Sequence, residues 1–280
     1  MGRNTVNIGI VATGRPITLD VAERVKAVAD ALYPERPPML RFHPHCFIEH
    51  GHFAGNDAAR ADAFVEMAND PAIDAVWIAR GGYGACRMAG DALARLGEAA
   101  RTKAYLGYSD AGVLLAGLYA GGIGRVAHGP MPVDIVRQGG EVAVARALRW
   151  LVERDLDAVE HHIVSGGLPT AAFNITILGS LLGTPLEPGL AGHVLMLEEV
   201  TEYHYRIDRA LFHITGNAGV RKVAGIRLGR CSDIPQNDTD FGMDEAEIVQ
   251  AWCARAGIAY LGRADIGHDV GNKVVPFGRL

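Results

Sequence analysis

A serine in a glycine-rich turn is the sharpest chemical signal in this sequence. Residues 107–112 read GYSDAG, which approximates the G-x-S-x-G nucleophile elbow with alanine in place of the last glycine. Such an elbow exposes a serine hydroxyl between a strand and a helix, where the next backbone amide faces a developing oxyanion. The pattern predicts Ser109 as a nucleophile and the Asp110 amide as an oxyanion donor. The same residues also fit a turn in which the serine only caps a helix.

A second glycine-rich loop, RGGYG at residues 80–84, also follows an apolar run. Glycines allow backbone amides to approach a ligand closely, so this loop could supply a second oxyanion donor beside Ser109. A dinucleotide-binding loop is disfavoured, because its fingerprint needs a third glycine where Arg87 stands. A plain turn between a strand and a helix is the remaining alternative.

A serine nucleophile needs a base, and the base needs an orienting carboxylate. His128, at the end of a strand, and His268, in a glycine-flanked loop, compete as the base, and either could be structural instead. Glu198 and Glu199 end an apolar run and are the candidate acids. If a strand continues through them, their side chains point to opposite faces, and only one can serve a given site.

Composition limits the classes of function. The chain has 280 residues, of which 49% are hydrophobic and 21% charged, with a net charge of −5. This balance fits a globular protein, and the negative charge argues against a nucleic-acid partner. No run of 18 apolar residues or signal peptide is recognised, so we expect a cytoplasmic protein without membrane contact. The four cysteines form no C-x-x-C pair, and we interpret the histidines of residues 43–52 as a surface loop; no metal or organic cofactor is expected.

The elements that must position these residues alternate between strands and helices. The sequence predicts strands at residues 6–12, 75–79, 103–107, 125–127, 193–198 and 223–228, with short ones near 259 and 274. It predicts helices from Thr18 to about 32, from Asn56 to about 69, over 86–96, 111–120, 141–153 and 203–215, and from Asp244 to about 256. This alternation indicates a parallel sheet with helices on both faces and a site at the carboxyl ends of the strands.

We expect two domains with the active site at their interface. Residues 1–150 should form a doubly wound parallel-sheet α/β domain that carries the nucleophile. Residues 151–165 should be a linker, because the pattern becomes mixed and polar there. Residues 166–280 should form a smaller α/β domain that carries the acid and the base.

Taken together, these segments resemble the LD-carboxypeptidase family of serine peptidases, also called muramoyltetrapeptide carboxypeptidases. The resemblance is distributed over most of the chain, and the order and spacing of its pieces make it specific. It is carried by residues 53–57 with Arg60, 73–84, 107–110, 128–131, 197–199, 205–209, and Gly267 and His268 with Asn272.

The resemblance implies a Ser–Glu–His triad of Ser109, Glu198 and His268, with the backbone amides of Gly82 and Asp110 as oxyanion donors. His128 matches a family position that is not the base, and Glu199 falls where the family often has aspartate. The implied reaction releases the terminal D-alanine of a murein tetrapeptide in cell-wall recycling, and the family commonly forms homodimers.

The substrate-binding candidates follow from the same resemblance. They are Arg80, Tyr83, Arg206 and Asn174, and either arginine suits a terminal carboxylate. The sequence departs from the family where Ala172 and Phe173 replace the usual glycines. Phe173 is expected either to narrow the site or to change the substrate preference.

Three alternatives stay open at this stage. A relative of the microcin-immunity peptidases would share the triad and cleave a peptide–nucleotide antibiotic. A catalytically silent ligand-binding protein could have the same fold, although the intact triad argues against it. A nucleotide-dependent enzyme would use the loop at residues 81–84.

Overall fold

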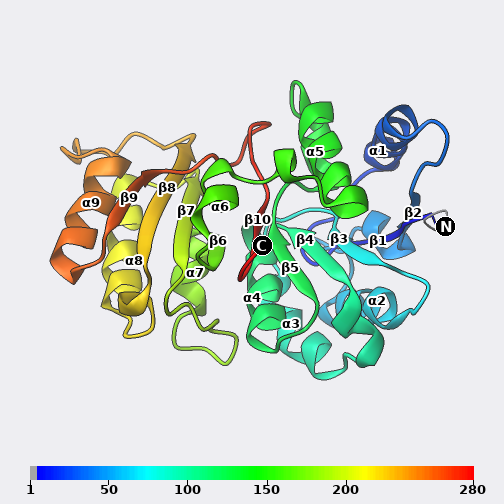
Figure 1. Cartoon of the computed structure of the whole chain (residues 1–280), viewed down its shortest axis with the longest axis horizontal. Helices are drawn as coiled ribbons and strands as arrows, with labels where there is room; N and C mark the ends of the chain where they lie inside the picture. The colour runs from blue at the N-terminus through cyan, green and yellow to red at the C-terminus, as the bar shows by residue number, and fades with distance from the viewer. Residues whose placement is uncertain (1–4) are drawn as a thin grey trace.

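The strands of this protein form two sheets that lie next to each other. The computed structural model describes residues 5–280, and within them one sheet has six strands and the other four. Figure 1 shows the two sheets in separate lobes, with β10 between them. The expected α/β fold with two sheet-centred parts is confirmed.

The first sheet has the strand order β10-β5-β4-β3-β1-β2. Its strands are β1 (Asn7–Val11), β2 (Met39–Phe42), β3 (Ala75–Ile78), β4 (Ala104–Gly107), β5 (Arg125–His128) and β10 (Val275–Pro276). All pair in parallel except β10, which runs antiparallel to β5. The inner strands are almost wholly buried, as expected for a sheet that helices cover on both faces.

Helices cover both faces of the first sheet. They are α1 (Leu19–Leu32), α2 (Asp57–Asn69), α3 (Ala85–Ala94), α4 (Gly112–Ala120) and α5 (Gly140–Glu153). In Figure 1, α1 and α5 lie above the sheet, and α2, α3 and α4 lie below it. Two predicted helix starts are confirmed by their caps, because Thr18 Oγ1 accepts from the Val21 amide and Asn56 Oδ1 from the Ala59 amide.

The second sheet is parallel throughout, in the order β6-β7-β8-β9. Its strands are β6 (Thr170–Asn174), β7 (Val194–Val200), β8 (Gly225–Ser232) and β9 (Tyr260–Arg263). Its helices are α7 (Ile175–Leu181), α8 (His204–Gly216) and α9 (Glu245–Ala256). The pairing of β7 with β8 shifts register between Leu197 and Glu199, at one of the candidate acids.

Two connections join the lobes. Residues 154–169, which the sequence pattern left mixed, contain a 3₁₀ turn (Leu156–Ala158) and the short helix α6 (His161–Gly166). The C-terminal segment returns to the first sheet: β10 pairs with β5, and Gly278 then exchanges backbone hydrogen bonds with Thr170 at the start of β6. The C-terminal segment therefore contacts both sheets, and the boundaries expected at residues 150 and 166 stay a proposal.

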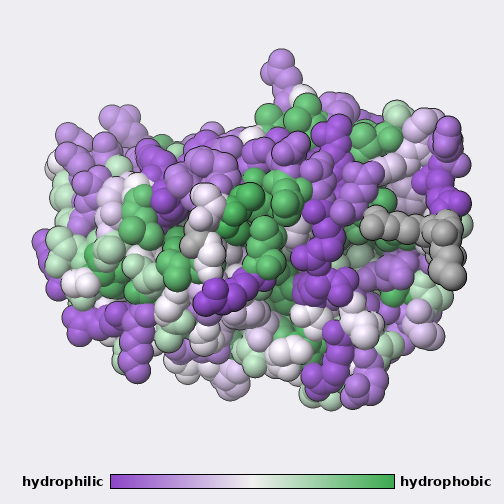
Figure 2. All heavy atoms as spheres, viewed as in Figure 1, coloured by the Kyte–Doolittle hydropathy of each residue, from purple (hydrophilic) through white to green (hydrophobic). Residues whose placement is uncertain are grey.

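The surface agrees with this packing. Figure 2 shows polar side chains over most of the visible face and an apolar area near its middle, where the lobes meet. No helix within residues 5–280 is long and apolar enough to cross a membrane.

Candidate active site

Ser109 lies at the carboxyl end of β4, in a 3₁₀ turn (Ser109–Ala111) that leads directly into α4. Its φ is +61°, in the left-handed region that a residue with a side chain rarely adopts. A strained serine between a strand and a helix is the geometry of a nucleophile elbow. The helix-cap alternative finds no support, since the Ser109 side chain makes no cap hydrogen bond within the described chain.

The glycine-rich loop after β3 lies against this serine. A methyl group added at Gly81 would be only 3.0 Å from Ser109 Oγ, so the loop approaches the hydroxyl closely. Gly82 has a φ of +108°, a conformation that glycine adopts without strain.

The Asp110 carboxylate holds this loop in place. Its Oδ2 accepts from the Ala85 amide at 2.9 Å, at the beginning of α3. Burial raises the pKa of Asp110, and hydrogen bonds from the amides of Ala85 and Gly84 oppose the rise. Asp110, which follows Ser109, thus fixes the segment that carries the Gly82 amide.

His268 and Glu198 form a buried pair. His268 Nδ1 lies 2.5 Å from Glu198 Oε2, with the histidine 9% exposed and the glutamate fully buried. Burial lowers the pKa of His268, but the Glu198 carboxylate outweighs burial and raises it overall. Since an ionised carboxylate only accepts, His268 donates from Nδ1 and keeps Nε2 to take up a proton.

Glu198 and Glu199 point to opposite faces of β7, as strand alternation predicts. Glu199 accepts from Asn174 Nδ2 and from both the amide and the hydroxyl of Thr176. Burial raises its pKa, and these hydrogen bonds oppose the rise. Glu199 therefore anchors the start of α7, and only Glu198 reaches the histidine.

His128 is separated from this pair. It is 1% exposed, and its Nε2 lies 3.1 Å from Asn272 Oδ1. Burial lowers the pKa of His128 to about 4, so the ring is neutral near pH 7. Its contact is with the loop that carries His268 and not with Ser109.

Ser109 and His268 line one cavity of about 500 Å³ between the lobes, together with Arg80, Gly82, Val136 and Thr201. No hydrogen bond within residues 5–280 joins Ser109 to His268. Such bonds commonly shorten only when substrate is in place.

Two arginines line the cavity. Arg80 forms no ion pair within the described chain and donates only to the Pro16 carbonyl, at 3.4 Å. Burial, and to a smaller degree the charge of Arg15, lowers its pKa. Arg137, which the sequence reasoning missed, pairs instead with the buried Asp134 at 3.1 Å. Arg137 lies just beyond a short 3₁₀ turn (Pro132–Val136), and no sequence motif marks it.

The other candidate binding residues lie elsewhere. Arg206 is on α8, where it lines separate surface cavities and pairs with Glu202. Tyr83 is half exposed and packs near the rings of His52 and Phe53. Asn174 is buried and caps α7 by accepting from the Ile177 amide.

Phe173 lies in the core rather than in the cavity. It is 1% exposed, and its ring centroid is 5.1 Å from that of Phe277. Phe173 does not line the cavity that holds Ser109 and His268, so its side chain does not narrow it.

Comparisons with known proteins find matches over most of the chain. Residues 8–129 match the model of an LD-carboxypeptidase N-terminal domain, and residues 169–280 match that of an LD-carboxypeptidase C-terminal domain. A Streptomyces coelicolor protein assigned as a carboxypeptidase is 32% identical over 97% of this chain and 88% of its own. A murein tetrapeptide carboxypeptidase of Pseudomonas aeruginosa is 28% identical over 84% of this chain and 80% of its own.

Solved structures share the fold. The muramoyltetrapeptide carboxypeptidase of Oxalobacter formigenes superposes with a TM-score of 0.76 at 23% identity, covering 96% of this chain and 93% of that one. A microcin C7 self-immunity protein superposes with a TM-score of 0.77 at 17% identity, covering 99% and 92%. At these identities the likeness concerns the fold alone.

Proposed function

The chain belongs to the LD-carboxypeptidase family and is a serine-type carboxypeptidase, and from this premise we propose that it removes the terminal D-alanine of murein tetrapeptides. The bond cleaved joins an L-configured centre to that D-alanine. We propose Ser109 as the nucleophile, His268 as the base and Glu198 as the orienting acid. The product fits a role in the recycling of cell-wall peptides.

The proposed mechanism follows from the positions of these groups. His268 Nε2 takes the proton of Ser109 Oγ as the oxygen attacks the peptide carbonyl. The amides of Gly82 and Asp110 stabilise the oxyanion, and His268 then returns the proton to the departing D-alanine nitrogen. Water, activated by the same histidine, hydrolyses the acyl-enzyme and frees Ser109.

A carboxypeptidase must also recognise a free terminal carboxylate. Arg80 suits this role because it lines the cavity, is partly buried and has no carboxylate partner among the described residues. Arg206 is disfavoured by its position on α8.

One observation carries the proposal: the strained Ser109 and the His268–Glu198 pair line the same cavity. The test compares three tetrapeptides that end in D-alanine, L-alanine or D-alanine amide. We expect efficient release only from the first, because the site must read both the configuration and the free carboxylate. Equal release from all three would contradict the proposed specificity.

A second candidate substrate is a peptide joined to a nucleotide. A second cavity, of about 850 Å³, is lined by the aromatic residues Tyr203, Tyr205 and Phe241. Tyr203 follows two residues after Thr201, which lines the cavity of Ser109 and His268. Such rings could stack on a nucleobase. A Tyr205→Ala variant distinguishes the two candidate substrates. If an aminoacyl-sulfamoyl nucleoside is the substrate, the variant should cleave it at least tenfold more slowly than the wild type. The rate of tetrapeptide cleavage should stay unchanged in this variant.

A further inference from the structure

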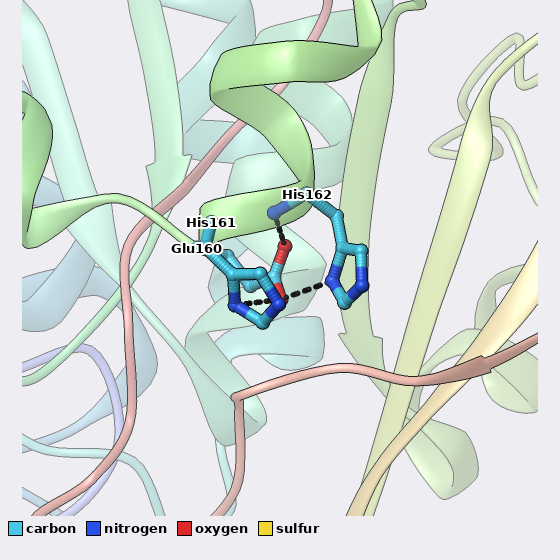
Figure 3. Close-up of side chains that lie close together, drawn as sticks. All are labelled: Glu160, His161 and His162. Carbon is cyan, nitrogen blue, oxygen red and sulfur yellow. Dashed lines mark hydrogen bonds and ion pairs between the residues drawn. The ribbon is translucent and has the colours of Figure 1, made fainter.

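A second cluster of chemically active side chains lies outside the active cavity, on the connection between the lobes. Glu160 precedes α6, and the first two residues of that helix are His161 and His162. Figure 3 shows both imidazole rings turned toward the Glu160 carboxylate. Glu160 Oε1 lies 3.3 Å from His161 Nδ1 and 2.9 Å from His162 Nδ1.

The charge of Glu160 is the unusual feature of this cluster. Its side chain is fully buried, and within residues 5–280 its ion-pair partners are only these two histidines. A buried carboxylate is costly without a cationic partner. Glu160 Oε2 accepts from the His162 amide at 2.9 Å, as the N-cap of α6, whereas Oε1 faces the two imidazole rings, whose centroids are 3.8 Å apart. Within the described residues no lysine or arginine pairs with Glu160, so the cluster holds no permanent cation.

We propose that Glu160, His161 and His162 bind a divalent zinc ion, with Glu160 Oε1 and the two Nδ1 atoms as ligands. Each of the three residues offers a donor atom that lies within 4.8 Å of those of the other two. Zinc bonds of about 2.0–2.2 Å to nitrogen and oxygen place neighbouring ligands roughly 3.3 Å apart, so small side-chain rotations suffice. Two nitrogens and one carboxylate oxygen favour zinc over magnesium or calcium. Water completes the coordination on the exposed side, where His161 is 71% exposed.

The position of the cluster indicates what the ion would do. Glu160 Oε1 also accepts from the Asp265 amide at 3.3 Å, and the Glu160 amide donates to the Val274 carbonyl at 3.0 Å. Asp265 and Val274 bracket the loop that carries His268. A zinc ion would therefore brace the connection between the lobes against that loop, and we expect it to stabilise the fold without entering the reaction.

The experiment measures zinc bound to the untagged full-length protein. The protein is equilibrated with a low concentration of Zn²⁺ by dialysis, and bound metal is counted by mass spectrometry. The wild type should hold one equivalent more than a His161→Ala/His162→Ala double variant. Glu160→Gln, which keeps the shape but loses the charge, should weaken binding at least tenfold. Zinc at a hundred times its Kd should raise the Tm of the wild type by roughly 5 °C.

Two controls separate this site from other histidines. His213→Ala removes an exposed histidine at the end of α8 and should bind as the wild type does. His268→Ala should also keep the equivalent, because its ring belongs to the active cavity. Equal zinc content in the wild type and the double variant would overturn the proposal and leave a hydrogen-bonded cluster only. Loss of the equivalent in His268→Ala alone would overturn it as well, by placing the ion in the active cavity.

Discussion

At the scale of single residues, the proposed reaction depends on the charge of one buried carboxylate. Glu198 is fully buried and contacts His268 through Oε2, while its Oε1 has no hydrogen-bond partner among the described groups. Its charge raises the pKa of His268, as the geometry of the pair requires. The base must be neutral to accept a proton, so the rate should rise with pH through this raised pKa.

The first prediction replaces Glu198 with glutamine. Glu198→Gln removes the charge that raises the pKa of His268, so the rising limb of the rate profile should move to lower pH. The loss of orientation should lower kcat by about 10³–10⁴. Rates measured between pH 5 and 9 on wild type and variant check both effects. Glu199→Gln serves as the neighbouring control, and its rising limb should move far less, because Glu199 contributes less than Glu198 to the raised pKa of His268. An unshifted limb in Glu198→Gln would contradict the assigned pair.

The second prediction concerns the terminal carboxylate. Arg80→Ala should raise KM for the tetrapeptide by roughly 10–100-fold, because a hydrogen bond to a charged group contributes about 1.5–3 kcal/mol. Arg206→Ala is the matched control and should leave KM unchanged, since Arg206 lines other cavities. Steady-state kinetics on both variants provide the test. The opposite outcome, with KM raised only in Arg206→Ala, would reject Arg80 as the carboxylate-binding residue.

At the scale of elements, the pair is positioned by the close approach of β7, β8 and the loop before His268. Gly229 on β8 permits this approach: an added methyl group would lie 2.6 Å from Ile266 Cγ1 and 3.1 Å from Glu198 Cβ. The register shift of β7 falls at the same point, between Leu197 and Glu199. A single glycine thus lets both members of the pair reach each other.

The third prediction tests that packing. Gly229→Ala should displace Ile266 or Glu198, cost about 1–3 kcal/mol of stability and lower kcat more than it raises KM. Gly90→Ala is the control, because a methyl group there meets no atom within 4 Å. Thermal unfolding and kinetics measure the two effects. Wild-type kcat in Gly229→Ala would show that the approach is not needed.

The elements could be predicted where their sequence patterns are strong. The helix after Asn56 ends at Asn69 as expected, and the cap of Asp244 begins α9. Two strands were missed. β2 is a half-exposed edge strand of four residues with little apolar signal, and β6 (TAAFN) contains small residues that do not stand out as an apolar run.

The candidate site shows the same division. The position of Ser109 follows from a local turn, so the sequence alone indicated it. Glu198 and His268 lie 70 positions apart in the sequence, and only the family resemblance suggested that they form a pair. The choice between Arg80 and Arg206 needed the three-dimensional arrangement, because the sequence does not show which arginine lines the cavity of Ser109 and His268.

At the scale of the whole molecule, the C-terminal segment holds the two lobes together. Phe277 is 7% exposed, and its ring centroid lies 5.6 Å from that of Tyr119 and 5.1 Å from that of Phe173. Tyr119 and Phe173 come from different lobes, and one continuous core cluster includes buried residues of both. The cavity with Ser109 and His268 exists only while this junction is packed.

The fourth prediction removes the aromatic ring at this junction. Phe277→Ala should cost about 3–5 kcal/mol and lower the Tm by roughly 10 °C in a single transition. Leu280→Ala, at an exposed position in the same segment, should change the Tm little. Calorimetry distinguishes the outcomes: two separate transitions, of which one is unshifted, would contradict a shared core.

The central claim is that Ser109 is the nucleophile of an LD-carboxypeptidase. The most direct measurement is mass spectrometry of a muramoyl tetrapeptide ending in diaminopimelate–D-alanine, after incubation with wild type and with Ser109→Ala. The wild type should release D-alanine, and the variant should lose about 10⁶ in kcat, which places it below detection. D-alanine release at equal rates by both proteins would contradict the assignment of Ser109, and release by neither would contradict the proposed substrate.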